Sequence, residues 1–272
     1  MIKALFFDLD GTLLNSQKRI PSSVRDALLD CRRHGVKVFF ATARSPRLDQ
    51  TLGWSADEFA LFDGGIYANG ACVHFEGHEV YRYIDPIAVE RCIQQANLFS
   101  DVHYSLHMPK DGYAFNFPVE PCMTQSWGLA QARICPISQE VIRQTVKLLI
   151  FYDHLTDSQR KLPCALTAGV REACSGLANV YLTDEGRTIQ LSGAGVGKCN
   201  AIEAIRQKLQ LTVEETAVFG DDVNDLEMIA FYPNSVAMGN AVVSVKKAAA
   251  FVTRENDADG VSYALGHLLP MA

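Results

Sequence analysis

Residues 2–12 read IKALFFDLDGT, an apolar run that ends in two aspartates separated by one residue. An apolar run of this kind is typical of a strand buried on both faces of a parallel sheet. Side chains two positions apart in a strand point to the same side, and the carboxyl ends of parallel strands form the usual ligand-binding crevice. We therefore expect the carboxylates of Asp8 and Asp10 to converge at such an edge, where Gly11 lets the backbone turn.

Two carboxylates at the end of a buried strand repel each other and are costly to desolvate. A divalent cation that neutralises both is the most economical explanation of the pair. The alternative is two solvated aspartates in a turn, because Asp-Gly is a common turn dipeptide. The whole string Asp8-Leu9-Asp10-Gly11-Thr12 favours the cation, since a specified five-residue string arises by chance in a chain of this length only about once in ten thousand sequences.

The sequence on both sides of this string predicts alternating strands and helices. Pro21, Ser22 and Ser23 begin a helix whose apolar residues recur at helical spacing until Gly35, and residues 36–41 form a second apolar strand. A strand, helix and strand in this order predict two parallel strands. The last ninety residues repeat the pattern, with helices and strands expected at 198–209, 216–219, 226–231, 236–238, 242–249 and 251–253.

The middle of the chain has a different texture. Glycines break it into predicted hairpins at Gly64, Gly65, Gly70 and Gly77, and residues 82–184 mix strands and helices less regularly. We therefore predict an α/β fold with two domains. A Rossmann-like, doubly wound parallel sheet forms the core from residues 1–81 and 185–272, and an α+β cap domain is inserted at residues 82–184.

Charge and composition exclude several classes of partner. The chain has 25 Lys and Arg against 31 Asp and Glu, a net charge of −6, and no basic block, so we do not expect it to bind nucleic acid. The longest stretch without a charged side chain, residues 228–245, is interrupted by Pro233 and Gly239, so we expect no membrane segment. Only four apolar residues separate Lys3 from Asp8, which is too short for a signal peptide and predicts a cytoplasmic protein.

The eight cysteines contain no C-x-x-C pair, so the sequence shows neither a zinc-ligand spacing nor a redox motif. We expect reduced side chains, and four disulfides are the alternative.

Four ordered segments carry a resemblance to a known family. Asp8 to Thr12 resembles the first motif of the haloacid dehalogenase superfamily of Mg²⁺-dependent phosphohydrolases, in which the first Asp is the nucleophile. Residues 41–44, ATAR, resemble the second motif, whose Thr hydroxyl and following backbone N–H hold the transferring phosphoryl group. The family usually has Gly where Ala43 stands, and alanine would be strained there if the site required a positive φ.

The third and fourth motifs lie in the carboxyl-terminal part. Lys198 follows the glycine-rich residues 193–197 and resembles the lysine that pairs with nucleophile and phosphate. A P-loop and a dinucleotide fingerprint do not match, because Ser192 and Lys198 occupy positions that those motifs reserve for glycine. Residues 220–225, GDDVND, resemble the fourth motif, G-D-x-x-N-D. Residues 236–241 and 259–261 are similar to the closing segments of the Cof-type branch, which carries a C2-type cap inserted after the third core strand.

The resemblance implies a Mg²⁺-dependent phosphomonoesterase that hydrolyses small phosphorylated metabolites, sugar phosphates by default, through an aspartyl-phosphate. Asp8 would attack phosphorus, and Asp10 would act first as general acid and then as general base. Mg²⁺ would bind the Asp8 carboxylate, the Asp10 carbonyl and Asp221, while Asp225 would orient a metal-bound water. The expected phosphate ligands are the N–H groups of Leu9 and Ala43 and the side chains of Thr42, Lys198 and Asn224.

Other functions on the same scaffold remain open. A phosphotransferase or mutase would differ only in the acceptor of the phosphoryl group, and a non-catalytic phosphometabolite sensor would not need Asp10. Dehalogenation would gain nothing from Asp10 and Asp221 as metal ligands. Tyr67, Asn69 and Gly70 either border the substrate entrance or form a hairpin turn. The histidine pairs 103/107 and 74/78 each share one face, which suits either a second metal site or surface histidines.

Overall fold

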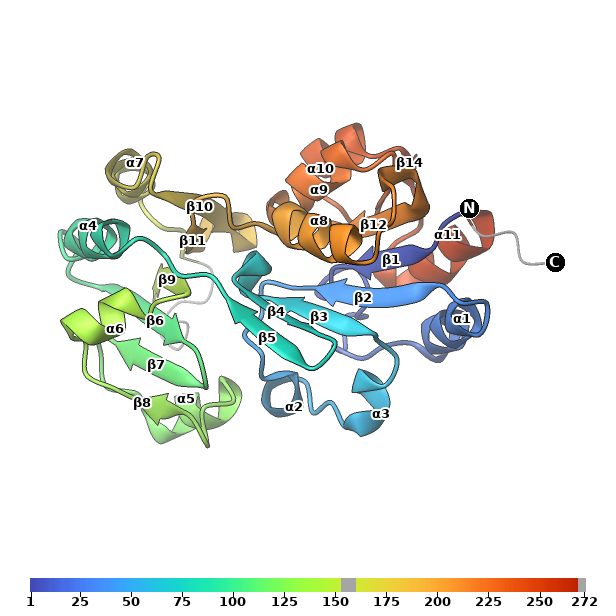
Figure 1. The fold of residues 1–272 in the computed structure, drawn as a ribbon. Coiled ribbons are helices and arrows are strands. Elements are labelled where there is room, and N and C mark those ends of the chain that lie inside the picture. The colour runs from blue at the N-terminus through green and yellow to red at the C-terminus, as the bar shows by residue number, and fades with distance from the viewer. Residues whose placement is uncertain (153–159, 269–272) are drawn as a thin grey trace. The chain divides into compact units, whose positions relative to one another are not determined.

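The computed structural model describes residues 1–152 and 160–268. The chain forms two compact units (Figure 1). Unit 1 comprises Met1–Arg44, Leu52–Glu79 and Lys198–Ala272, and unit 2 comprises Ser45–Thr51 and Val80–Gly197. The predicted α/β class is confirmed. The predicted domain boundaries, after residues 81 and 184, stay a prediction.

Unit 1 is organised around a sheet in the order β14-β13-β12-β1-β2-β3-β4-β5. The strands from β14 to β3 are parallel to their neighbours, and β3 and β4 form an antiparallel hairpin. The strand bounds are Ala4–Phe7 (β1), Lys37–Ala41 (β2), Gly64–Tyr67 (β3), Cys72–Phe75 (β4), His78–Tyr81 (β5), Thr216–Gly220 (β12), Asn234–Ala237 (β13) and Phe251–Val252 (β14). The parallel pair predicted from residues 2–41 and the hairpin predicted from the glycines are both present.

The central strand β1 is buried along its whole length, as its apolar run predicts. The ring of Phe6 stacks on Phe39 of β2 with centroids 4.7 Å apart, and Phe7 meets Phe219 of β12 at 4.5 Å. Aromatic rings of this kind bury large apolar areas, which is the dominant favourable contribution to folding. The core therefore fixes β1 between β2 and β12, and with it the position of the residue that follows β1.

Helices and short turns complete unit 1. Helix α1 (Ser22–Arg33) begins after Pro21, buries Val24, Leu28 and Cys31, and ends before Gly35, whose φ is +80°. This helix matches the predicted apolar spacing. The other helices of unit 1 are α3 (Ala56–Phe59), α8 (Lys198–Lys208), α9 (Leu226–Phe231), α10 (Val243–Ala248) and α11 (Gly260–Leu268). Among the described residues, none of the helices has the length and apolar character needed to cross a membrane.

Unit 2 contains a second sheet, in the order β10-β11-β9-β6-β7-β8, in which only β7 and β8 are parallel. Its strands are β6 (Val102–Met108), β7 (Gly112–Phe115), β8 (Arg133–Ile134), β9 (Lys147–Tyr152), β10 (Ala178–Thr183) and β11 (Thr188–Gly193). Its helices are α2 (Leu48–Thr51), α4 (Pro86–Ala96), α5 (Pro121–Ser126), α6 (Gln139–Arg143) and α7 (Cys164–Ala173).

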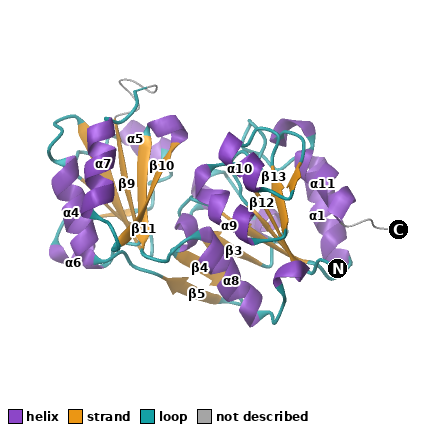
Figure 2. Cartoon of the chain, turned by 90° about the horizontal axis from the view of Figure 1, so that it is seen from above, coloured by secondary structure: helices purple, strands orange, loops and turns teal. Residues whose placement is uncertain are grey.

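The two faces of this sheet differ in chemistry. Figure 2 shows α4, α6 and α7 along one side of the strands, and this side forms the apolar core of unit 2. In β6, Tyr104 and Leu106 belong to that core. Because side chains alternate along a strand, the intervening residues His103, Ser105 and His107 face the other way.

Close packing between β2 and β3 leads to a stability prediction. A Cβ atom added at Gly65 would lie 2.2 Å from the ring of Phe40, which is held by edge contacts with Trp54 and Phe62. We expect Gly65→Ala to lower the free energy of unfolding by about 1–3 kcal/mol because this ring cannot move away cheaply. Chemical denaturation measures the effect. The control is Gly266→Ala in α11, where an added Cβ meets nothing and should raise stability by up to about 1 kcal/mol. Equal effects of the two substitutions would contradict this view of the packing.

Candidate active site

The parallel register brings the sequence motifs to one edge of the unit 1 sheet. Phe7 of β1 pairs with Phe40 of β2 and with Phe219 of β12. Asp8 follows β1, Thr42 follows β2, and Asp221 follows β12. Three segments distant in sequence therefore end side by side, at the sheet edge where α/β proteins bind ligands.

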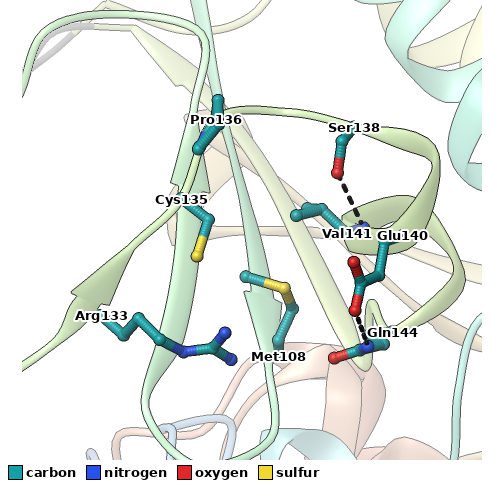
Figure 3. A pocket seen from close by; sticks show the side chains of 8 residues that line it. All are labelled: Met108, Arg133, Cys135, Pro136, Ser138, Glu140, Val141 and Gln144. Atoms are coloured by element: carbon teal, nitrogen blue, oxygen red, sulfur yellow. Dashed lines mark hydrogen bonds between the residues drawn. The ribbon is translucent and has the colours of Figure 1, made fainter.

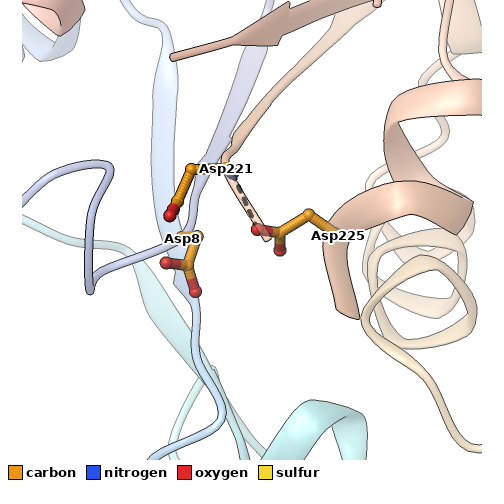
Figure 4. Close-up of side chains that lie close together, drawn as sticks. All are labelled: Asp8, Asp221 and Asp225. Atoms are coloured by element: carbon orange, nitrogen blue, oxygen red, sulfur yellow. Dashed lines mark hydrogen bonds between the residues drawn. The ribbon is translucent and has the colours of Figure 1, made fainter. Parts of the chain in front are cut away.

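Three carboxylates meet at this edge (Figure 4). Asp8, Asp221 and Asp225 each have an oxygen within 4.8 Å of the others, and Asp8 and Asp225 are buried. Oδ2 of Asp225 accepts hydrogen bonds from the backbone N–H groups of Asp221 at 2.9 Å and Asp222 at 3.1 Å. Asp225 thus holds the loop that presents Asp221, which leaves Asp8 and Asp221 as the carboxylates better placed to bind a metal ion.

Lys198 connects two of these carboxylates. It is the first residue of α8 and is buried, and its Nζ donates to Oδ1 of Asp8 and, at 2.6 Å, to Oδ1 of Asp225. Burial alone would lower the pKa of Lys198, but Asp225 and Asp8 reverse this effect and raise it above its ordinary value. The ammonium is therefore charged throughout the physiological pH range.

One ammonium does not neutralise three carboxylates, so the fully ionised cluster carries two net negative charges. Burial, together with the charges of Asp225 and Asp221, raises the pKa of Asp8 well above its usual range despite the opposing effect of Lys198. Burial and Asp225 raise the pKa of Asp221 to about 7. Mg²⁺ prefers oxygen ligands and would remove the excess charge, so the donor set suits this ion.

The turn after β1 is shaped to hold Asp221. The hydroxyl of Thr12 donates to Oδ1 of Asp221 at 2.7 Å. Gly11 has φ +82°, and a Cβ atom there would lie 2.3 Å from Oδ2 of Asp221. Both the backbone conformation and the close approach of the carboxylate require glycine. Gly11 therefore packs directly against the acid cluster, and Asp8 of the same motif is buried in that cluster rather than solvated in a turn.

Asp10 lies among cations and apart from the acid cluster, so the expected convergence of its carboxylate with that of Asp8 is wrong. Arg44 binds both of its carboxylate oxygens, through Nε at 2.6 Å and Nη2 at 2.7 Å, and Lys18 donates to Oδ1 at 2.7 Å. Burial opposes ionisation, but the hydrogen bonds and charges of Arg44 and Lys18 prevail and lower the pKa of Asp10 to about 2. In this conformation Asp10 is a carboxylate and has no proton to donate.

The remaining predicted phosphate ligands line the same strand ends. Thr42 is buried, and its Oγ1 accepts the Arg44 N–H at 3.1 Å. Ala43 does not adopt a positive φ, so alanine in place of the family's usual glycine causes no backbone strain. Asn224 Nδ2 donates to Oδ1 of Asn69 at 2.9 Å. Leu9 is buried, and its carbonyl accepts two backbone hydrogen bonds from the turn that follows β1.

The sequence did not identify all the partners in this site. Lys18 belongs to none of the four motifs. It lies in the loop between β1 and α1, and the fold of that loop brings it to Asp10. Arg44 was part of the second motif but had no assigned role. The sequence indicates only that Asn69 lies at the substrate entrance or in a hairpin turn. Its left-handed backbone (φ 54°, ψ 36°) presents its side chain to Asn224. A signal was available at Asn69, since asparagine adopts this conformation more readily than most residues.

Lys198 gives the first prediction for this site. Without the ammonium, two buried carboxylates lose their shared partner, so we expect Lys198→Met to lower the free energy of unfolding by about 3–5 kcal/mol at pH 7 without divalent metal. Denaturant unfolding in the presence of a chelator measures the loss. The control is Lys208→Met, which removes a largely exposed pair with Glu76 and should change stability by less than about 1 kcal/mol. A loss below about 1 kcal/mol for Lys198→Met would show that the buried pairs do not hold the site together.

Asp10 gives a prediction about pH. Its folded-state pKa of about 2 lies below the ordinary 3.8, so its ionised form contributes stability above pH 4 that is lost as the pH falls toward 2. We expect Asp10→Asn to destabilise the metal-free protein by roughly 1 kcal/mol at pH 7, with the difference from wild type shrinking between pH 4 and pH 2. Unfolding curves at several pH values test this, with Asp26→Asn on α1 as the control. A difference that does not change with pH would rule out the charge pairing as its source.

Comparison with known proteins agrees with this geometry. YkrA of Bacillus subtilis is 29% identical over 270 residues, which cover 98% of this chain and 97% of YkrA. The HMP-PP phosphatase of Klebsiella pneumoniae is 28% identical over 253 residues, which cover 90% of this chain and 87% of that protein. The solved structure of the sugar phosphatase BT4131, of HAD subclass IIB, matches with a TM-score of 0.76 at 25% identity and covers 98% of both chains.

The match to a family description extends over nearly the whole chain. Residues 5–265 match the haloacid dehalogenase-like hydrolases. This range contains the three carboxylates of the cluster, Lys198 and all of unit 2. The chain is thus a member of the haloacid dehalogenase-like hydrolase family.

Proposed function

We propose that this protein is a Mg²⁺-dependent phosphomonoesterase that hydrolyses small phosphorylated metabolites through an aspartyl-phosphate, with sugar phosphates as the default substrate class. The observation that carries the proposal is the buried pair of Asp8 and Lys198 within a cluster that has two excess negative charges. The names of an HMP-PP phosphatase and a sugar phosphatase among its relatives support the class of reaction.

Asp8 is the proposed nucleophile. Lys198 engages Oδ1, so Oδ2 is the oxygen that would form the bond to phosphorus while the bond from phosphorus to the leaving oxygen breaks. Two anions approach each other in this step, and the buried ammonium offsets their repulsion. Mg²⁺, held by Asp8, Asp221 and the Asp10 carbonyl, would supply further charge neutralisation when bound.

Asp10 is the proposed acid and base, and its cation partners set a condition on that role. A leaving alkoxide needs a proton, whereas Arg44 and Lys18 keep Asp10 ionised. A phosphate dianion competes for these two cations because arginine and lysine side chains both donate strong hydrogen bonds to phosphate oxygens. We infer that substrate draws Arg44 from Asp10, which raises the pKa of Asp10 and lets it carry the proton to the leaving group. Ionised again, Asp10 then accepts a proton from the water that attacks the aspartyl-phosphate.

The other residues would hold the phosphoryl oxygens. Thr42 and the Ala43 N–H follow β2, and the Leu9 N–H follows the nucleophile, so all three donors belong to strand ends that the core fixes. Asn224 is held by Asn69 and would donate its amide. Donors placed before the reaction stabilise developing charge without reorganisation, which is the largest contribution in many enzymes.

The test is a screen of phosphorylated metabolites with and without Mg²⁺, repeated with Asp8→Asn. We expect phosphate release that requires Mg²⁺ and falls at least about a thousandfold in Asp8→Asn, because the amide is a poor nucleophile. Asp26→Asn, on the exposed surface of α1, is the control and should keep full activity.

The intermediate has its own readout. Acid quenching during turnover of a ³²P-labelled ester should leave label on the protein, which hydroxylamine removes as expected for an acyl phosphate and which Asp8→Asn does not acquire. Transfer of phosphate to an added alcohol in preference to water would identify a phosphotransferase. Turnover that persists in Asp8→Asn, or that does not depend on Mg²⁺, would contradict the proposal.

A further inference from the structure

The face of the unit 2 sheet opposite its apolar core carries a row of polar residues at one end. In the register of β6 with its two neighbours, His107 lies opposite Tyr113 of β7 and opposite Lys147 of β9. These three residues therefore occupy adjacent positions on one face, turned away from the apolar core. Farther along the same face the residues are largely aromatic: His103, Phe115, Phe117, Trp127 and Phe151 contact one another.

His107 is held as a neutral group in this row. Its Nδ1 lies 3.0 Å from the hydroxyl of Ser45, and its Nε2 lies 3.0 Å from the hydroxyl of Ser105. Burial and the charge of Lys147 lower its pKa well below the usual value. The hydroxyls can satisfy both ring nitrogens, so a metal ion is not needed to explain this histidine.

Arg47 lies at the same end of the sheet, and its hydrogen bonds are incomplete. It is only 2% exposed, yet its Nε and Nη1 have no hydrogen-bond acceptor. The nearby carboxylate, Asp111, approaches Nη1 only to 3.5 Å, and its own side chain is 46% exposed. The guanidinium also lies 6.0 Å from the ring centroid of Tyr113.

This arrangement is unlike a fully hydrogen-bonded pair of arginine and carboxylate. Arginine and carboxylate commonly form two parallel hydrogen bonds with donor and acceptor 2.7–2.9 Å apart. Arg44 and Asp10 in unit 1 show that geometry, at 2.6 and 2.7 Å. A buried guanidinium with two nitrogens that lack acceptors carries a desolvation penalty of the kind that a bound anion removes.

We propose that Arg47, with Tyr113, His107 and Lys147, forms an anion subsite in unit 2 that binds a second acidic group of the substrate, a carboxylate or a phosphate. The inference rests on the proposed function and narrows its substrate class to phosphate esters that carry another negative charge. Two cationic side chains, a phenol and a neutral histidine supply donors of the type that both anions accept.

The covalent chain relates this subsite to the candidate active site. Arg44, which binds Asp10, and Arg47 are three residues apart, so their Cα atoms cannot be more than about 11 Å from each other. One short loop therefore carries the arginine proposed to meet the ester phosphate and the arginine proposed to meet the second anion.

A nearby cavity in unit 2 is a weaker candidate (Figure 3). It has a volume of about 240 Å³ and lies beside Met108, Arg133, Glu140 and Gln144. Its polar side chains include a pair bonded to each other, since Gln144 donates to Glu140 at 3.2 Å. It shows no buried group without a partner comparable to Arg47, so it carries no proposal.

The first test observes Arg47 directly and needs no catalysis. In the full chain labelled with ¹⁵N, the Nε–H resonance of Arg47 is assigned by its disappearance in Arg47→Lys. Titration with D-glycerate and, separately, with inorganic phosphate should shift this resonance with half-saturation in the millimolar range, and glycerol should not. A shift with one anion alone identifies the acidic group. No shift with either anion up to 50 mM overturns the subsite.

The second test uses turnover of three matched esters: propane-1,3-diol monophosphate, its bisphosphate, and the analogue with a carboxylate in place of the free hydroxyl. We expect at least one anionic ester to have a KM about tenfold or more below that of the neutral ester. Arg47→Met should abolish this preference while kcat stays within about threefold, and Arg47→Lys should keep part of it. Arg171→Met removes an exposed charge on α7 and should change nothing.

The outcomes separate the subsite from the proposed function. If Arg47 responds to anions but no ester of the metabolite screen is hydrolysed, the phosphomonoesterase proposal fails, the role of the subsite in substrate binding fails with it, and only an anion site at Arg47 stands. If Arg47→Met slows all three esters equally, Arg47 has a structural role and the subsite is wrong. If Arg47→Met does not fold, Arg47→Lys together with the resonance titration decides the question.

Discussion

The buried ammonium of Lys198 is the interaction on which the site depends. It bonds to Asp8, which follows β1, and to Asp225, which follows β12 by one short turn. Removing Lys198 leaves both carboxylates buried without their shared cation, and removing either carboxylate leaves Lys198 with only one of its two partners. The loss of a buried partner is far more costly than the loss of an exposed pair. The apolar core places the strand ends side by side, but the ammonium makes it possible for the acids to remain there together.

The same site contains a second and different electrostatic arrangement. The cluster around Lys198 has too much negative charge, whereas Asp10 is surrounded by the two cations Arg44 and Lys18. Burial raises the pKa of Asp8 in the cluster, whereas hydrogen bonds from Arg44 and Lys18 lower the pKa of Asp10. Carboxylates separated by one residue thus lie in opposite electrostatic environments, Asp8 among other acids and Asp10 between two cations.

The sequence predicted the parts of this site that depend on strand ends. The convergence of Asp8 and Asp221 follows from apolar runs and parallel pairing, which are local or topological signals, whereas the pairing of Lys198 with Asp8 was implied by the family resemblance alone. The partners of Asp10 could not be predicted, because Lys18 reaches it through a loop whose path no periodicity describes. Ala43 shows a further limit. From the sequence, alanine at this position could have been strained, and only the backbone angles show that Ala43 occupies the second motif without a positive φ.

Two side chains of the candidate active site lie where the chain passes from one unit to the other. The chain passes between the units at four places, and two of these border functional side chains: Arg44 precedes unit 2 directly, and Lys198 follows it directly. Lys198 is anchored by two buried ion pairs and opens a helix, so its position tolerates little change. Arg44 lies in a loop and holds Asp10 through side-chain bonds alone, which a phosphate can replace. Arg44 can therefore exchange its bonds to Asp10 for bonds to a phosphate more readily than Lys198 can give up its two buried acids.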